Sequence, residues 1–217
     1  MRRSIAIAGA AGLFAIGLSG CETMSAEECL TADWEQIGYE DGSRGRPPHY
    51  LENRRQACVE NAGIQPDGAA WERGRQAGLE TYCTPQNGWR IGSSGGAYEG
   101  VCFGSNAYGF ERAFNTGRRK YELQQAVNDL DGRVNDVRYR TDQIDRDRAD
   151  VEARLKEDDV PPQERDRLLR RLKELSERRG SLREQERDLV DERAYAEAEL
   201  SRFRADLSGP YRDYDRY

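Results

Sequence analysis

An apolar seam with alternating steps of four and three residues runs through the second half of the chain, and it limits the fold more than any other feature. Eight of ten seam residues are apolar in its first stretch, and nine of twelve in its second. The first stretch is Leu123, Val127, Leu130, Val134, Val137, Thr141, Ile144, Arg148, Val151 and Leu155; the second is Leu168, Leu172, Leu175, Arg179, Leu182, Glu186, Leu189, Arg193, Ala196, Leu200, Phe203 and Leu207. Sustained steps of this kind are typical of a left-handed coiled coil.

Two adjacent prolines, Pro161 and Pro162, interrupt the seam. Proline ends a helix but suits the first turn of the next one, so the chain should turn near 157–163 and return. Residues whose numbers sum to about 323 then face each other, and no two charged seam residues fall in one layer. We therefore predict an antiparallel coiled-coil hairpin over 106–207, followed by a disordered tail over 208–217. The pattern leaves pairing between molecules open, so an oligomer is compatible with it.

The region before the hairpin has a different composition, rich in Gly, Cys, Trp and Pro, whereas about half of 106–207 is charged. Helices are expected at about 26–42, 50–61 and 67–82. Ser25 followed by Glu28 is a capping-box pattern that starts the first helix. Asn87-Gly88 is typical of a tight turn, with a loop after it. The expected fold is thus mainly α: a small helical head over 21–105, stapled by disulfides, followed by the long hairpin.

Glycines recur at helical spacing in the head. Trp34-x-x-x-Gly38-x-x-x-Gly42 is echoed by Trp71-x-x-Gly74-x-x-x-Gly78, and Phe114-x-x-Gly117 is a candidate third copy. Glycines four residues apart lie on one face of a helix, where they let two backbones approach closely. We interpret the repeat as close helix packing, with a groove for a ligand as the alternative.

The amino-terminal stretch carries an export signal. Arg2 and Arg3 precede an apolar run over 5–18, which is shorter than the ~20 residues that a membrane-spanning helix needs. The run ends in Leu18-Ser19-Gly20-Cys21, which resembles the bacterial lipobox. That resemblance implies cleavage after residue 20 and acylation of Cys21, for instance by palmitate. A Glu at position 22, in place of the Asp that favours inner-membrane retention, favours the outer membrane.

The other four cysteines are Cys29, Cys58, Cys83 and Cys102. An even number in an exported chain indicates disulfides, with three connectivities available. Antiparallel first and second helices would bring Cys29 beside Cys58. Cys83, at the far end of the third helix, then pairs with Cys102 across the glycine-rich loop. A zinc site is the alternative, but no Cys-x-x-Cys pair supports it.

Composition and motifs favour no chemistry. Cleavage at Cys21 removes two arginines, which leaves 32 basic against 40 acidic residues, a net charge of −8, so we expect no nucleic-acid partner. His49 is the single histidine, and no catalytic constellation forms around it. We expect no enzyme activity, no cofactor and no metal. The aromatic residues of the head either line a ligand pocket or fill the core: Trp34, Tyr39, Trp71, Trp89 and Tyr98.

Several motifs together resemble a family of bacterial lipoproteins, domain of unknown function 2799. They are Asp33-Trp34, the Gly-Tyr-x-Asp-Gly run over 38–42, and the ending Tyr98-Glu99-Gly100-Val101-Cys102. The resemblance covers about residues 25–121. It implies a small cysteine-containing envelope module ahead of a helical tail, and it supplies no activity, cofactor or catalytic residue.

These features predict a lipid-anchored protein of the bacterial cell envelope, on the outer membrane and facing the periplasm. We expect it to be non-enzymatic, with a structural or partner-binding role and a coiled-coil arm that engages a protein partner. The alternative is a head that binds a peptidoglycan fragment or a small molecule, with the hairpin as a spacer.

Overall fold

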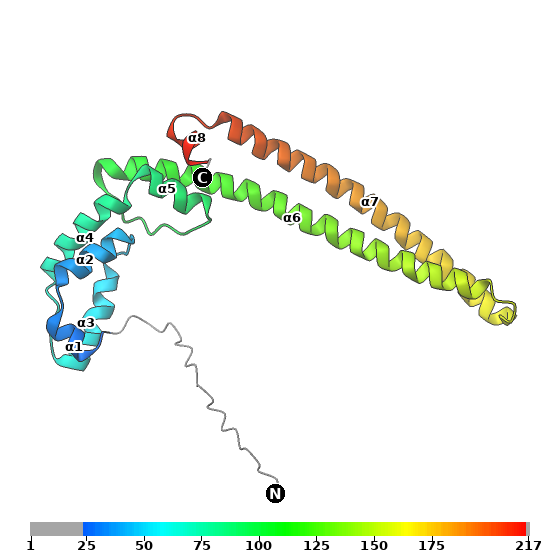
Figure 1. Cartoon of the computed structure of the whole chain (residues 1–217), viewed down its shortest axis with the longest axis horizontal. Helices are drawn as coiled ribbons and strands as arrows, with labels where there is room; N and C mark the ends of the chain where they lie inside the picture. Colours follow the sequence, from blue (N-terminus) through cyan, green and yellow to red (C-terminus); the bar gives the residue numbers. More distant parts are fainter. Residues whose placement is uncertain (1–23, 216–217) are drawn as a thin grey trace, which may run out of the picture. The chain divides into compact units, whose positions relative to one another are not determined.

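The computed structural model describes residues 24–215, and every regular element in that range is a helix. The described residues divide into two compact units (Figure 1). Unit 1 holds residues up to 82 together with 99–101, and unit 2 holds 83–98 and everything from 102 onward. The predicted signal peptide and Cys21 lie outside the described residues. The division after residue 82 differs from the expected boundary at 105, because the next helix packs within unit 2.

Unit 1 consists of four helices. They are α1 (Ala26–Thr31), α2 (Trp34–Ser43), α3 (His49–Ala62) and α4 (Gly68–Tyr82). Ser25 and Glu28 form the predicted capping box at the start of α1. The single helix expected over 26–42 is divided in two, because Asp33 is extended and its carboxylate accepts hydrogen bonds from the N–H groups of residues 35 and 36. An Asp at this position satisfies the free donors of a new helix start, so it ends one helix and begins another.

The core of unit 1 is built by two pairs of helices. α2 packs mainly against α4, and α1 packs against α3. Trp34 and Trp71 are buried together with the Cys29–Cys58 disulfide, which joins α1 to α3. The sequence had suggested that the single helix expected over 26–42 packs against the second helix. Only its first part, α1, does so, because the glycines of α2 and α4 bring those two helices together.

Unit 2 begins with a helix where a turn was expected. Its elements are α5 (Pro85–Ser93), α6 (Gly104–Leu155), α7 (Pro162–Asp206) and α8 (Pro210–Tyr214). The tight turn predicted at Asn87-Gly88 is wrong, because both residues lie inside α5. Thr84 caps this helix by accepting a hydrogen bond from the N–H of Asn87, and Pro85 occupies the first turn. The Cys83–Cys102 disulfide closes the segment around α5.

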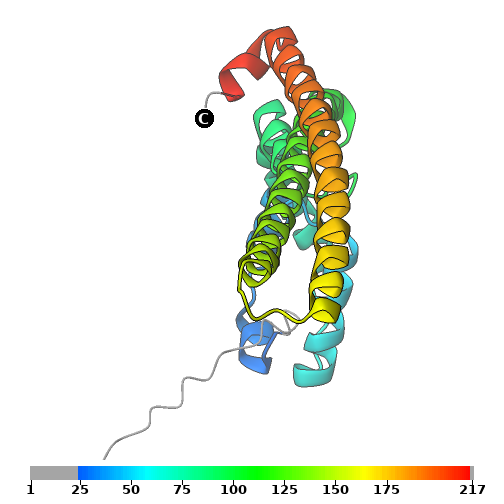
Figure 2. The ribbon, with the colours of Figure 1, turned by 90° about the vertical axis from the view of Figure 1, so that its right-hand side faces the viewer.

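The predicted hairpin is confirmed: α6 and α7 lie side by side and antiparallel (Figure 2). α7 has 45 residues, which corresponds to about 67 Å of helix. The middle of the seam is a continuous apolar cluster of Val134, Val137, Ile144, Leu175, Leu182 and Leu189. Ion pairs across the seam agree with the predicted register. Glu186 pairs with Arg138 and Arg193 with Asp131, each one residue after the seam residue expected to face it.

The carboxyl-terminal residues fold back as α8, in contrast to the disordered tail expected over 208–217. Tyr211 stacks on Trp89 with ring centroids 5.8 Å apart. Asp215 forms an ion pair with Lys120 of α6. Leu207 is buried in the same apolar cluster as Trp89. The tail therefore covers the base of the hairpin, where α5, α6 and α7 meet, and it forms part of the core of unit 2.

Candidate functional site

The glycines of α2 and α4 hold these helices in backbone contact. A Cβ added at Gly38 would lie 1.9 Å from the carbonyl oxygen of Trp71, and one at Gly74 would lie 1.8 Å from that of Glu35. Both distances are far below van der Waals contact, so no larger residue fits without moving a helix. The packing interpretation of the glycine repeat is confirmed here, because backbone fills the space that a ligand groove would require.

A second crossing, of α5 with α6 in unit 2, repeats this arrangement. A Cβ at Gly88 would lie 2.4 Å from the carbonyl oxygen of Phe110, and one at Gly117 would lie 2.6 Å from that of Trp89. The two crossings correspond residue by residue. Along α2 and α5 and the turns that follow them, Gly38, Gly42 and Gly45 correspond to Gly88, Gly92 and Gly95. Along α4 and α6, Trp71, Gly74, Gly78 and Tyr82 correspond to Phe110, Ala113, Gly117 and Tyr121. The internal repeat is thus a pair of helix crossings, in which α2 corresponds to α5 and α4 corresponds to α6. The sequence had instead suggested that α2 and α4 are copies of each other.

Both crossings also end in the same way. Gly45 and Gly95 have φ angles of 71° and 77°, in the left-handed region that side chains disfavour. At each glycine an added Cβ would meet an aromatic ring, that of Tyr82 in the first case and that of Tyr121 in the second. The shared glycine-on-tyrosine contact is the strongest indication that the two crossings are copies of one structural unit.

A buried carboxylate distinguishes the first crossing. Asp41 of α2 has no exposed surface. Its Oδ2 accepts a hydrogen bond from Trp71 Nε1 at 2.9 Å, its Oδ1 accepts one from Arg54 Nη2 at 2.8 Å, and Arg46 Nε lies 3.9 Å away. The equivalent positions of the second crossing hold Ile91 and Phe110, without such a cluster. Asp41 therefore ties α2, α3 and α4 together.

In the sequence, Asp41 stands out only as part of the Gly-Tyr-x-Asp-Gly run, and no role could be predicted for it. The sequence does contain a sign of a buried charge: this acidic residue lies between Gly38 and Gly42, which share one packed face of the helix. A charge at such a place must be paired to be stable in the interior. Its partners Arg54 and Trp71 come from other helices, so the sequence alone could not name them.

The five aromatic residues considered as a ligand surface do not form one site. Trp34 and Trp71 are buried in the core of unit 1, while Tyr39 lies at its surface. Trp89 is buried in unit 2 under Tyr211. For the three tryptophans the structure thus supports the core alternative, since each fills the space beside a helix crossing.

Tyr98 braces the loop that precedes α6. Its hydroxyl accepts a hydrogen bond from the N–H of Cys102 at 3.0 Å, and its ring packs 4.7 Å from that of Phe110. Burial raises the pKa of this phenol, and the nearby Glu111 carboxylate adds to the rise, against the opposing hydrogen bond from Cys102. The tyrosine therefore stays neutral and serves as a hydrogen-bonding support for the Cys83–Cys102 bridge.

The hairpin carries two open grooves, and each is lined by a glycine in mid-helix. The first is bordered by Asn128, Asp129, Gly132, Arg133, Asp136, Val137, Gln185 and Leu189, and the second by Gly180, Arg183, Glu186, Arg187, Val190 and Asp191. No atom lies within 4 Å of a Cβ added at Gly132 or at Gly180, once the helix's own neighbours are set aside. Glycine costs ~1 kcal/mol relative to alanine inside a helix, and nothing in the described residues compensates for it here.

Three of the four charged seam residues are held by partners on the other helix, whereas Arg148 pairs with Glu152 of its own helix. Arg193 donates a hydrogen bond to Asp131 at 3.0 Å, and Arg179 donates one to Asp145 at 3.2 Å. Glu186 accepts a hydrogen bond from Arg138 at 2.6 Å. The long side chains lie along the neighbouring helix with their charged ends paired at its edge.

The structure bears on metal-ligand clusters, membrane-spanning helices and the single histidine for the described residues alone. Residues 24–215 contain no group of three or more His, Cys, Asp or Glu side chains placed to hold a metal ion. In the same range no helix combines the length and the apolar character needed to cross a bilayer. His49, the single histidine, is exposed and lies beside Tyr50.

A comparison with known proteins matches the part of the chain that holds the two glycine crossings. Residues 33–119 match the sequence model of a family described as protein of unknown function (DUF2799). The match is to the DUF2799 family. It spans both glycine crossings, from the cap of α2 to just beyond Gly117, and it ends before the apolar seam begins. Searches of curated proteins and of solved structures found no match. The matched region thus contains both helix crossings and the start of α6, and the apolar seam of the hairpin lies outside it.

Proposed function

We propose that this chain is a lipid-anchored protein of the bacterial cell envelope, placed on the outer membrane and facing the periplasm. In this proposal its role is non-enzymatic: the unit that carries α1 to α4 stays near the membrane, and the hairpin of α6 and α7 binds a protein partner. The lipobox-like stretch Leu18-Ser19-Gly20-Cys21 supports the anchor. Two disulfides in the described residues are consistent with an oxidising compartment.

One observation carries the partner-binding role: Gly132 and Gly180 occupy helix interiors that need no glycine for folding. Each lines a groove, and each leaves its helix surface open to a close approach by another backbone. Glycines in the two crossings are used in this way within the chain. By the same physical reasoning, the glycines of the hairpin make room for a helix or strand of another protein.

The test compares photo-crosslinking in intact cells at three positions of the hairpin. A crosslinking amino acid replaces Asp136 in the first groove, Arg187 in the second, or the exposed Lys173, which borders neither groove. We expect adducts with one and the same partner protein at 136 and 187, and several-fold weaker adducts at 173. Equal yields at all three positions would contradict docking in the grooves.

Alanine at both glycines separates binding from folding. The double variant Gly132→Ala, Gly180→Ala should lose the adducts, because a methyl group fills the space that the partner backbone occupies. Its own stability should rise, because alanine is the better helix former, so the loss cannot come from unfolding. Ser201→Ala on the exposed face of α7 is the matched control and should retain them. Release of the protein from membranes by Cys21→Ser tests the anchor separately.

A further inference from the structure

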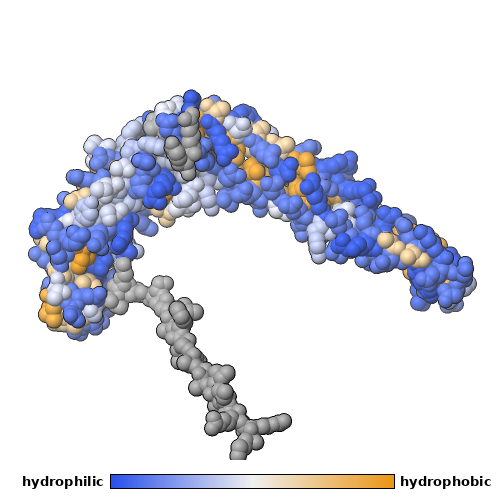
Figure 3. Space-filling model, in the orientation of Figure 1, coloured by the Kyte–Doolittle hydropathy of each residue, from blue (hydrophilic) through white to orange (hydrophobic). Residues whose placement is uncertain are grey.

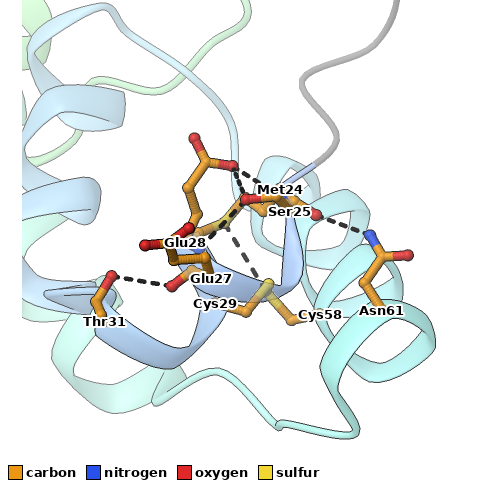
Figure 4. Close-up of a disulfide and its surroundings, with 8 residues drawn as sticks. All are labelled: Met24, Ser25, Glu27, Glu28, Cys29, Thr31, Cys58 and Asn61. Carbon is orange, nitrogen blue, oxygen red and sulfur yellow. Dashed lines mark hydrogen bonds between the residues drawn. A yellow bond between two sulfur atoms is a disulfide. The ribbon is translucent and has the colours of Figure 1, made fainter.

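The chain is held in a fixed position at Met24, three residues after Cys21 (Figure 4). The Met24 side chain is buried, with its sulfur 3.9 Å from the sulfur of Cys58. Its carbonyl oxygen accepts a hydrogen bond from Asn61 Nδ2 at 2.8 Å. The next residue, Ser25, is fixed by the capping box with Glu28. Met24 is therefore attached to α3.

A lipid on Cys21 then leaves unit 1 almost no freedom to move away from the membrane. This step rests on the proposed function, in which Cys21 is acylated. Three peptide steps span at most ~11 Å, and an acylated cysteine lies at the level of the headgroups. The polar headgroup layer is itself ~5–7 Å thick on each side of a bilayer. The surface around Met24 must therefore lie against the headgroups.

Apolar side chains are exposed at this end of unit 1. Leu30 of α1 is 68% exposed and Val59 of α3 is 40% exposed. Each follows a cysteine of the Cys29–Cys58 bridge, whose Cα atoms are 5.5 Å apart. The Cα atoms of Leu30 and Val59 are thus at most ~13 Å apart. Hydrophobic side chains reach the surface in this part of the space-filling view (Figure 3).

Carboxylates dominate the charges nearby, because Arg55, one helical turn before Val59, is paired with Glu52. Residues 24–33 and 57–67, which surround the bridge, contain five carboxylates and no Lys, Arg or His. The carboxylates are Glu27, Glu28, Asp33, Glu60 and Asp67. At physiological salt they act over ~8 Å, so an anionic lipid surface repels this end. Zwitterionic headgroups with a terminal ammonium group suit it instead.

We propose that α1 and the last turns of α3 form a membrane-contact face, with Leu30 and Val59 against lipid and the acidic rim against ammonium headgroups. The anchor fixes which lipid surface is met, and the short tether keeps its effective concentration high. The disulfide between the two helices keeps the two apolar residues at a fixed separation on that surface.

The test places a photo-crosslinking amino acid at position 30 or 59 of the full-length, lipidated protein in vesicles of phosphatidylethanolamine and phosphatidylcholine. Tyr139, 62% exposed on α6, is the control position. We expect phospholipid adducts at 30 and 59 in several-fold higher yield than at 139. Adding phosphatidylglycerol should lower the yields at 30 and 59. Equal yields at all three positions, or adducts at 30 and 59 only with protein, would overturn the proposal.

A longer tether provides the second variant. A flexible Gly-Ser spacer between Glu22 and Thr23 leaves every described residue unchanged, and it should lower the lipid adducts at both positions several-fold, because effective concentration falls as a linker lengthens. Unchanged yields would contradict a face held down by the tether. The mass of the Cys21 peptide, measured on the same samples, separates the outcomes: an unmodified cysteine refutes the proposed anchor, whereas an acylated one without lipid adducts refutes the contact face alone.

Discussion

In the crossings of α2 with α4 and of α5 with α6, a methyl group in place of a glycine hydrogen would meet a carbonyl oxygen about 2 Å away, whereas at Gly132 and Gly180 of the hairpin it would meet nothing. One helix, α6, shows both cases, with Gly117 in a crossing and Gly132 in the hairpin. In the crossings glycine is required by the fold. In the hairpin glycine lowers the stability of the helix and serves no packing within the chain, and for this reason we assign it to partner binding.

The two crossings differ from each other as well. Each has the same glycine spacing and the same glycine-on-tyrosine ending, but the first encloses the Asp41 cluster and the second encloses apolar and aromatic side chains. The comparison shows that the glycines set the distance between the helices, while the side chains beside them can be ionic or apolar. Four experiments test these differences, beginning with the largest expected effect.

Removing the Asp41 carboxylate tests whether the first crossing depends on its charge. Asp41→Ala leaves the Arg54 guanidinium and the Trp71 N–H without this buried partner, and the loss should reduce the free energy of unfolding by ~3–5 kcal/mol. Denaturant unfolding followed by tryptophan fluorescence measures it. Asp142→Ala, on the exposed surface of α6, is the control and should change stability by less than ~0.5 kcal/mol. A loss as small as that of the control would show that the cluster does not hold the helices together.

Adding a methyl group at a crossing tests the backbone contact itself. Gly38→Ala or Gly74→Ala should destabilise the protein by about 3 kcal/mol, because a helix must move to relieve the overlap with backbone. The same denaturation experiment measures this change. Gly88→Ala should do likewise in the second crossing. A variant as stable as the parent would contradict a backbone contact at that glycine.

The same substitution in the hairpin should act in the opposite direction. Gly132→Ala and Gly180→Ala should each raise the stability of the protein by ~0.5–1 kcal/mol, because alanine is the better helix former and the added methyl group meets no neighbour. Thermal unfolding measured by circular dichroism shows the change. Destabilisation would mean that these glycines pack against something within the chain after all.

The smallest effect concerns the hairpin turn, where Glu164 accepts hydrogen bonds from Arg154 at 2.9 and 3.2 Å. This contact holds the pKa of Glu164 below its ordinary value of 4.5. Because the pKa is lower in the folded than in the unfolded state, the contact stabilises the turn at pH values above the unfolded-state pKa. That contribution is lost as the pH falls through the folded-state pKa. The carboxyl chemical shift of Glu164, followed by NMR against pH, should have its midpoint below 4.5. Arg154→Gln should return it to the ordinary range; an unchanged midpoint would contradict the assignment.

The sequence predicted the hairpin well because its information is local and periodic. Alternating steps of four and three residues define the seam, and Pro161 with Pro162 marks the turn. The start of α1 was likewise predicted from Ser25 and Glu28 alone. The Cys29–Cys58 pair was predicted from antiparallel packing of the first two helices, and the Cys83–Cys102 pair from the place of Cys83 at the far end of the third, although the sequence also allowed two other connectivities.

The remaining features depend on contacts between distant segments. Gly88 was expected in a turn because Asn-Gly favours one, but its neighbour Phe110, far along the chain, makes it a packing residue inside α5. Asp33 was expected inside a helix and instead begins one. Tyr211 was expected in a disordered tail, since nothing local shows that Trp89 offers it a surface. In each case the deciding partner lies in another element, which no local pattern reveals.

Because α6 and α7 pair in an antiparallel register, the arm can change its length only if both helices change together. Adding residues to one helix alone would slide every layer beyond that point and break the ion pairs that join Arg138 to Glu186 and Arg193 to Asp131. A whole heptad added to both helices at facing positions would keep each layer and both ends intact. Related chains could therefore change the reach of this arm only by adding or removing whole heptads in both helices, which changes its length in steps of ~10 Å.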